Sequence, residues 1–216
     1  MKLLIIDTSK QTAFVIAKCD ENSYVKVIPE TKRHSEELLN TIEELLSELN
    51  LTLNSFDALC GVTGPGSFTG IRIGLATIKA FLCANNNIKC LASNYFECVA
   101  KSIKNGTAVI KNTGTSCYLA QIKNGQVSNQ KIVNYADFNG ASSGDVYALQ
   151  EEHLEDALSY INLKIIDNYA NILINHFVSQ YKGKKFISIN DLSPYYMQAS
   201  QAERELEERT NDKKTN

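Results

Sequence analysis

The first hundred residues alternate short apolar runs with longer segments of helical periodicity. Residues 2–6 form an apolar run typical of a buried strand. Two further β-rich runs, 12–18 and 24–28, follow closely and predict a three-stranded meander. Strands are also expected over 58–62 and 89–92. This part of the chain is therefore predicted to build a sheet interrupted by helices.

Three helices are predicted between and after these strands. The segment 35–50 carries one apolar stripe at helical spacing, with Ser35 as the expected N-cap. The stripe consists of Leu38, Leu39, Ile42, Leu45, Leu46 and Leu49. A second helix is expected over 71–84. A third follows Asn94, which forms a capping-box signature with Glu97, and runs to about Ile103.

The second half begins the same order of elements again, more weakly. Expected there are strands over 107–110, 117–122, 127–135, 145–149 and 186–189, a hairpin turn at Asn124-Gly125, and a helix over about 165–181. We therefore predict an α/β protein with two lobes of similar topology, 1–104 and 105–192, joined near Asn105-Gly106. A tail over 193–216 is expected to end as a solvated helix end or a disordered segment, because acids and bases mix from Gln201 onward.

Composition excludes several classes of function. Of the 216 residues, 44% are hydrophobic, and 22 basic against 24 acidic residues give a net charge of −2, so a strongly basic nucleic-acid binder is not expected. The first apolar run is too short for a signal peptide, and no apolar run is long enough to span a membrane. The 6 cysteines form no CxxC pair and the 3 histidines share no spacing, so we expect reduced core cysteines, no metal site and a cytoplasmic location.

The segment predicted as the second helix is unusually apolar. Within 71–84 only Arg72, Thr77 and Lys79 are polar. A helix that is apolar nearly all round is buried on both sides, and here the expected cover is another protein. Gly70 and Gly74 would let a partner helix approach closely. Because a cation in the first turn opposes the helix dipole, Arg72 is expected to have an anionic partner, a carboxylate or a phosphate.

Two loops could carry chemistry. The glycine-rich turn 61–74 could present backbone N–H groups to a phosphate, although it matches neither a P-loop nor a dinucleotide fingerprint; a purely structural turn is the alternative. Asp7-Thr8-Ser9 follows the first strand, where a carboxylate and hydroxyls could hold hydrated magnesium or orient a phosphate. The alternative for these three residues is a turn closed by Asx-type hydrogen bonds.

Together these motifs resemble the bacterial TsaB (YeaZ) family. The resemblance rests on residues 5–9, His34-Ser35-Glu36, and the long segment Gly64-Pro65-Gly66-Ser67-Phe68-Thr69-Gly70-Ile71-Arg72-Ile73-Gly74. Pro194-Tyr195-Tyr196-Met197-Gln198 is similar to a C-terminal P-x-Y-L-R element of the family, with Gln198 at the arginine position. The close match covers roughly residues 1–100.

The resemblance implies an ASKHA (actin-like) fold of two lobes, the second degenerate, and a non-catalytic subunit that binds and activates TsaD. TsaD forms N6-threonylcarbamoyladenosine at position 37 of tRNAs reading ANN codons; the ATPase TsaE joins the assembly and a TsaC/Sua-type synthase supplies threonylcarbamoyl-adenylate. It further implies that tRNA is engaged indirectly, that the chain alone forms a homodimer, and that it needs no cofactor of its own; a nucleotide at the junction with TsaD is left open.

Carried onto this sequence, the expected interface lies on the first two long helices. It comprises His34, Ser35, Leu38, Leu39, Ile42, Gly70, Arg72, Ile73, Gly74, Thr77, Ile78 and Phe81. A remnant of a phosphate-binding site is expected at Asp7, Thr8, Ser9, Gly64, Gly66, Ser67 and Thr69.

One departure bears on mechanism. Active ASKHA kinases open the second lobe with an acidic D-x-G-[ST] loop, whereas this chain has Asn112-Thr113-Gly114-Thr115, and an amide lacks the charge that holds magnesium. The alternative hypothesis is nonetheless a small ASKHA phosphotransferase or ATPase acting through Asp7 and the Gly64–Gly70 loop. A metallopeptidase is disfavoured because the sequence has no HxxxH.

Overall fold

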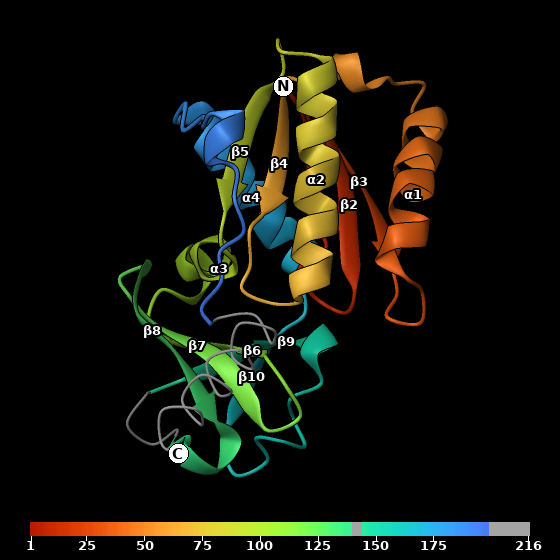
Figure 1. The fold of residues 1–216 in the computed structure, drawn as a ribbon. Helices are drawn as coiled ribbons and strands as arrows, with labels where there is room; N and C mark the ends of the chain where they lie inside the picture. The colour runs from red at the N-terminus through yellow and green to blue at the C-terminus, as the bar shows by residue number, and fades with distance from the viewer. Residues whose placement is uncertain (140–143, 199–216) are drawn as a thin grey trace, which may run out of the picture.

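The first of two five-stranded sheets is built by the N-terminal half of the chain (Figure 1). The computed structural model describes residues 1–139 and 144–198. The strand order is β3-β2-β1-β4-β5, with the first three antiparallel and the last three parallel. The bounds are β1 Lys2–Asp7, β2 Ala13–Cys19, β3 Asn22–Ile28, β4 Ala58–Val62 and β5 Lys89–Ser93.

The second sheet repeats this topology strand for strand. Its order, written from the other edge, is β8-β7-β6-β9-β10, and each pairing direction matches its counterpart in the first sheet. The bounds are β6 Gly106–Lys111, β7 Ser116–Lys123, β8 Gln126–Asn134, β9 Val146–Leu149 and β10 Leu163–Ile166. The repeat confirms the predicted two-lobed α/β architecture of the ASKHA class.

Helices separate the layers. The first sheet carries α1 (His34–Glu48) and α2 (Phe68–Ala84) on one face, in front in Figure 1, and α4 (Tyr169–Lys182) behind it. Together α4 and α3 (Tyr95–Ile103) fill the space between the two sheets, where one hydrophobic core joins both lobes. On the far face of the second sheet, the described residues form no long helix: Phe138, Leu154 and Leu158 pack there beside the short 3-10 helix η2 (Tyr135–Asp137). Another 3-10 helix, η4 (Gln150–Glu152), lies towards the first lobe, so the described part of the second lobe is reduced relative to the first.

The two lobes exchange their last helices. Although α3 follows the first sheet in the chain, it packs on β6, β7 and β8 of the second. In turn α4 follows the second sheet but packs on β1, β2 and β5 of the first. Aromatic residues at the helix starts, Tyr95 and Tyr169, are fully buried where the helices meet.

Local signals explain most helix starts. The Ser67 hydroxyl accepts from the Gly70 N–H at the start of α2, and Asn94 and Glu97 form the predicted capping box of α3. The hairpin turn at Asn124-Gly125 is also present, with φ of 53° and 72° at its two residues, as a type I′ turn requires. The prediction of Ser35 as N-cap was wrong, because α1 begins at His34.

Near the C-terminus, the start of one predicted helix and one predicted strand were wrong. The run 165–181 contains the end of β10 and then α4, because Ile166 still pairs with Leu149 of β9 and the helix starts only at Tyr169. The run 186–189 forms a single bridge, Ile187 to Cys90, before η5 (Ile189–Asp191). A short 3-10 helix, η1 (Leu53–Ser55), precedes β4.

None of the described helices is long and apolar enough to cross a membrane. The tail predicted from Gln201 onward lies outside the described residues, so the prediction for it stays untested.

Candidate functional site

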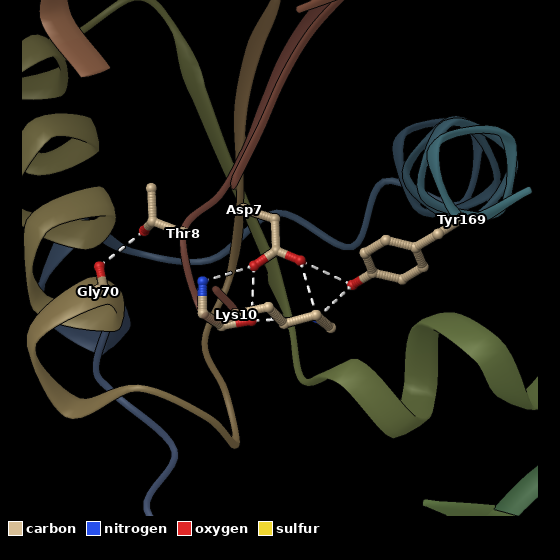
Figure 2. Close-up of polar contacts among 6 residues, drawn as sticks. Asp7, Thr8, Lys10, Gly70 and Tyr169 are labelled. Atoms are coloured by element: carbon tan, nitrogen blue, oxygen red, sulfur yellow. Dashed lines mark hydrogen bonds and ion pairs between the residues drawn. The ribbon is translucent and has the colours of Figure 1, made fainter. Parts of the chain in front are cut away.

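The loop after β1 holds a buried polar cluster centred on Asp7 (Figure 2). Asp7 Oδ1 accepts from the Ser9 N–H at 2.8 Å and from the Ser9 hydroxyl at 2.6 Å. Asp7 Oδ2 accepts from Lys10 Nζ at 3.0 Å and from the Tyr169 hydroxyl at 2.8 Å. The Asp7 side chain is fully buried, so these four bonds replace the water that the carboxylate loses on folding.

Lys10 donates hydrogen bonds to the same two hydroxyl groups that donate to Asp7. Its ammonium donates to the Tyr169 hydroxyl at 2.9 Å and to the Ser9 hydroxyl at 3.2 Å, and only 2% of its side chain is exposed. It also lies 4.6 Å from the ring centre of Tyr95 and 4.5 Å from that of Tyr169. Burial alone would raise the pKa of Asp7, but the Lys10 charge and the hydrogen bonds from Ser9 and Tyr169 hold that pKa below its ordinary value.

These contacts bear on the two readings of Asp7-Thr8-Ser9. The bond from the Ser9 N–H to Asp7 Oδ1 spans two residues, which is the Asx-type turn of the structural reading. The Thr8 hydroxyl donates to the Gly70 carbonyl at 2.7 Å and so faces α2. Only Ser9 of the three lines a cleft, so the loop as a whole is closed upon the protein itself.

The glycine-rich turn packs directly on this loop. The Ser67 N–H donates to the Ser9 carbonyl at 2.7 Å, and the Gly64 carbonyl accepts from the Tyr95 N–H at 2.8 Å. Gly66 and Ser67 line the same cleft as Ser9, whereas Thr69 lies over a separate hollow towards α1. Of the expected phosphate-site residues, the structure thus brings Ser9, Gly66 and Ser67 to one cleft.

The close contact at Gly70 and Gly74 is with the chain itself, which corrects the expectation of a partner helix there. A Cβ atom on Gly74 would lie 2.3 Å from Thr8 Oγ1, and one on Gly70 would come still closer to the Thr8 carbonyl oxygen. Both glycines are buried. They let the start of α2 lie against the residue that follows β1.

A cleft of about 750 Å³ lies between the lobes, at the mouth of these loops. The first lobe contributes Ser9, Lys10, Gln11, Gly66, Ser67, Phe68 and Arg72, and the second contributes Ile110 to Gly114, Tyr118 and Glu152; Gln198 of the C-terminal segment completes the lining. Glu152 is 7% exposed and accepts from the Lys111 N–H at 2.9 Å; its burial raises its pKa. Across the described residues, no three His, Cys, Asp or Glu side chains gather as a metal-binding group.

Residues 195–198 cross the mouth of this cleft and contact both lobes. The Tyr196 ring stacks on Phe68 at 4.5 Å, and its hydroxyl accepts from Arg72 Nε at 2.7 Å. Gln198 Nε2 donates to Asn112 Oδ1 at 3.0 Å and to the Tyr118 hydroxyl at 3.1 Å. Of the two anionic partners expected for Arg72, a carboxylate is not found among the described residues, where the partner is a phenol; a phosphate stays a prediction.

The expected interface residues fall into two groups. Leu38, Ile42, Gly74 and Ile78 are buried on the inner sides of α1 and α2, and Gly70 is buried as well but borders the hollow towards α1. Exposed or half-exposed are His34, Ser35, Leu39, Arg72, Ile73, Thr77 and Phe81. Leu39 is 58% exposed, and the small residues Ala76 and Ala80 continue the outer face of α2. The outer side of α2 thus leaves Ile73, Ala76 and Ala80 uncovered by the described chain, with the polar Arg72 and Thr77 at its edges.

Three polar residues that complete the site, Lys10, Glu152 and Tyr169, were not predicted from the sequence. Tyr169 lies within the segment 165–181, which was predicted only as a helix. The available signal was a lysine three residues after the aspartate that ends a buried strand. A carboxylate in such a place needs a counter-charge or a ligand.

Comparisons with known proteins agree with this fold and these motifs. A family model described as "TsaD: tRNA N6-adenosine threonylcarbamoyltransferase" matches residues 18–135, more than half of the chain. The chain is 30% identical over 130 residues to a tRNA threonylcarbamoyladenosine biosynthesis protein TsaB from Haemophilus influenzae, covering 56% of this chain and 54% of that protein. It is 42% identical over 69 residues to a tRNA N6-adenosine threonylcarbamoyltransferase from Rhizobium johnstonii, covering 31% and 19%.

A solved structure extends the likeness to almost the whole fold. YeaZ from Pseudomonas aeruginosa superposes with a TM-score of 0.70 at 18% identity, covering 90% of this chain and 99% of that one. Another Pseudomonas aeruginosa structure, titled as an uncharacterized protein with similarity to peptidase YEAZ, gives 0.73 at 18% identity, covering 91% and 99%. The chain spans about half the length, or less, of the first curated relatives that it matches.

Proposed function

This chain belongs to the TsaD family as a TsaB/YeaZ-type protein, and from that premise we propose that it takes part in forming N6-threonylcarbamoyladenosine at position 37 of tRNAs reading ANN codons. Its role in this proposal is that of a non-catalytic subunit, which binds TsaD and activates it. TsaD, not this chain, engages the tRNA and carries the reaction.

The observation that carries the proposal is the outer face of α2. Ala76 and Ala80 are exposed and Ile73 is half-buried on the side of α2 away from the sheet, and Leu39 is exposed on the adjacent helix α1. Exposing apolar side chains in a row has a free-energy cost that a bound partner removes. Short side chains such as alanine also let the backbone of a second helix approach. We therefore assign this face to TsaD, and to a second copy of the chain when TsaD is absent.

The polar cluster at Asp7 supports a subunit without catalysis of its own. All four acceptor directions of the Asp7 carboxylate are used by Ser9, Lys10 and Tyr169. In the second lobe, Asn112 stands where active relatives of the fold have a carboxylate. This pairing disfavours the alternative phosphotransferase, which needs free carboxylates for its magnesium.

The partner surface is tested by a charge placed on it. Ala80→Arg should abolish the complex with TsaD of the same organism in gel filtration with light scattering, because a long charged side chain would be desolvated in the contact. Gln126→Arg, which adds the same charge on exposed β8 of the second lobe, should leave the complex intact. A complex that survives Ala80→Arg would reject this surface.

The pathway is tested in cells. Depleting the protein should lower the modified adenosine in bulk tRNA, measured by mass spectrometry, and Gln126→Arg but not Ala80→Arg should restore it. Unchanged modification on depletion would reject the proposed pathway. TsaE should be recovered together with the complex from the same cells. The TsaC/Sua-type synthase should be needed for the modification but should not bind this chain.

A further inference from the structure

The ASKHA fold implies a nucleotide with a divalent cation between the lobes, near the end of the first strand, and the residues of this chain do not fit one. A carboxylate oxygen binds a metal through a lone pair, and a carboxylate offers about four such directions. In Asp7 these are taken by the Ser9 N–H, the Ser9 hydroxyl, Lys10 Nζ and the Tyr169 hydroxyl. No direction is left for a metal ion or for its water.

The Lys10 ammonium lies where three oxygen atoms converge. Asp7 Oδ2, the Tyr169 hydroxyl and the Ser9 hydroxyl lie at 3.0, 2.9 and 3.2 Å from Nζ, one for each of its three N–H groups (Figure 2). The hydrogen bonds are mutually consistent, because each hydroxyl donates to Asp7 and accepts from Lys10. Hard metal ions also bind among oxygen atoms that include a carboxylate. The Lys10 ammonium therefore occupies the kind of place that such an ion would take.

We propose that Lys10 is a built-in cation that replaces the divalent metal at the lobe junction, so that the junction is complete without metal or nucleotide. Its partners come from both halves of the chain: Asp7 and Ser9 follow β1, whereas Tyr169 opens α4. The ion pair itself lies within the N-terminal loop, and the two hydrogen bonds of the Tyr169 hydroxyl join it to the helix that returns from the second lobe. This inference concerns the chain alone and does not depend on the proposed function.

The substitution Lys10→Met tests whether the ammonium occupies a cation site. Methionine keeps most of the apolar stem but leaves the buried Asp7 carboxylate without a counter-charge. Breaking a buried pair in this way should lower the midpoint of thermal unfolding by about 10 °C. Because Lys10 lines the interlobe cleft, the freed space is open to small ions. Millimolar MgCl₂ or MnCl₂, at a pH where carboxylates are ionised, should then recover several degrees.

A matched variant separates metal binding at Asp7 from general salt effects. The double variant Asp7→Asn/Lys10→Met removes both charges, so MgCl₂ and MnCl₂ should not shift its unfolding midpoint. The wild type should likewise show no shift with MgCl₂, alone or with ATP. A Lys10→Met protein that is as stable as the wild type, or that ignores both metals, would overturn the proposal.

If Lys10→Met does not fold under any condition, metal binding by the wild type tests the same proposal. Binding of Mn²⁺, with and without ATP, is followed by electron paramagnetic resonance for the wild type and for Asp7→Asn. Equal weak binding by the two proteins supports the built-in cation. Tighter binding by the wild type would show that Asp7 still takes a metal beside Lys10, and would overturn it.

Discussion

The Tyr196 hydroxyl accepts a 2.7 Å hydrogen bond from Arg72 Nε while the Tyr196 ring stacks on Phe68. Arg72 and Phe68 lie in the first turns of α2, and two residues further along Gln198 reaches Asn112 and Tyr118 of the second lobe. A segment of four residues therefore connects the first lobe to the second across the mouth of the cleft.

Tyr196→Ala should lower the free energy of unfolding by about 1–2 kcal/mol, because it removes both the stacking and the hydrogen bond. Tyr196→Phe keeps the stacking and should cost no more than about 1 kcal/mol. Urea unfolding followed by circular dichroism measures both. Equal losses for the two variants would mean that the hydrogen bond, not the ring contact, holds the segment.

Gly74→Ala should destabilise the fold by about 2 kcal/mol, because the added Cβ would meet Thr8 Oγ1 at 2.3 Å. The cost should outweigh the gain in helix propensity of about 1 kcal/mol. Thr8→Ala removes the obstructing atom, so the double variant should lose less stability than the sum of the two single variants. Simple additivity in urea unfolding would contradict this close contact.

His176 should make the protein lose stability on mild acidification. Its Nε2 lies 2.7 Å from the Ser93 hydroxyl and 2.9 Å from Gln180 Nε2, which can only donate, and within the described structure its Nδ1 has no partner. Burial, with the nearby charges of Lys101 and Lys185, lowers the pKa of His176 from 6.5 to about 4. Folding therefore favours the neutral ring.

The sign follows from proton uptake. Between pH 6.5 and 4 the unfolded chain binds the His176 proton and the folded chain does not, so the stability falls as pH falls, by up to about 3 kcal/mol at the lower end. His176→Leu should remove this part of the pH dependence, as measured by urea unfolding at several pH values. An unchanged profile would show that His176 does not titrate in this window.

Asn112→Asp should not create an ATPase. The change restores the acidic D-x-G-[ST] loop of the second lobe, and the new carboxylate can still accept from Gln198. Asp7 remains engaged by Lys10, so one free carboxylate is expected to be insufficient for magnesium-dependent ATP binding. Calorimetry with MgATP checks this, and tight binding by Asn112→Asp would revive the phosphotransferase hypothesis.

The elements with a local signal could be predicted from the sequence. The capping box at Asn94, the turn at Asn124-Gly125 and the buried strand before Asp7 each need only neighbouring residues, and all three are present. The end of β10 at Ile166 could not be predicted, because its pairing with β9 decides it. The apolar run from there into α4 favours a helix when read alone.

Residues whose roles depend on distant contacts also escaped prediction. Lys10 acquires its role from Tyr169, which is 159 positions away in the chain. Two glycines four residues apart, Gly70 and Gly74, indicate that some other group comes close to the helix. Only the fold shows that this group is Thr8. The pattern thus predicted a close approach correctly but assigned it to the wrong molecule.

The exchange of α3 and α4 between the lobes has a consequence for dissecting the protein. A fragment ending before β6 would lack α4 and leave the rear of its own sheet, including Leu3, Ile5 and Phe14, open to water. The complementary fragment would lack α3 in the same way. Neither piece is expected to be soluble when expressed separately, and co-expression of the two should be required to reconstitute the native molecule.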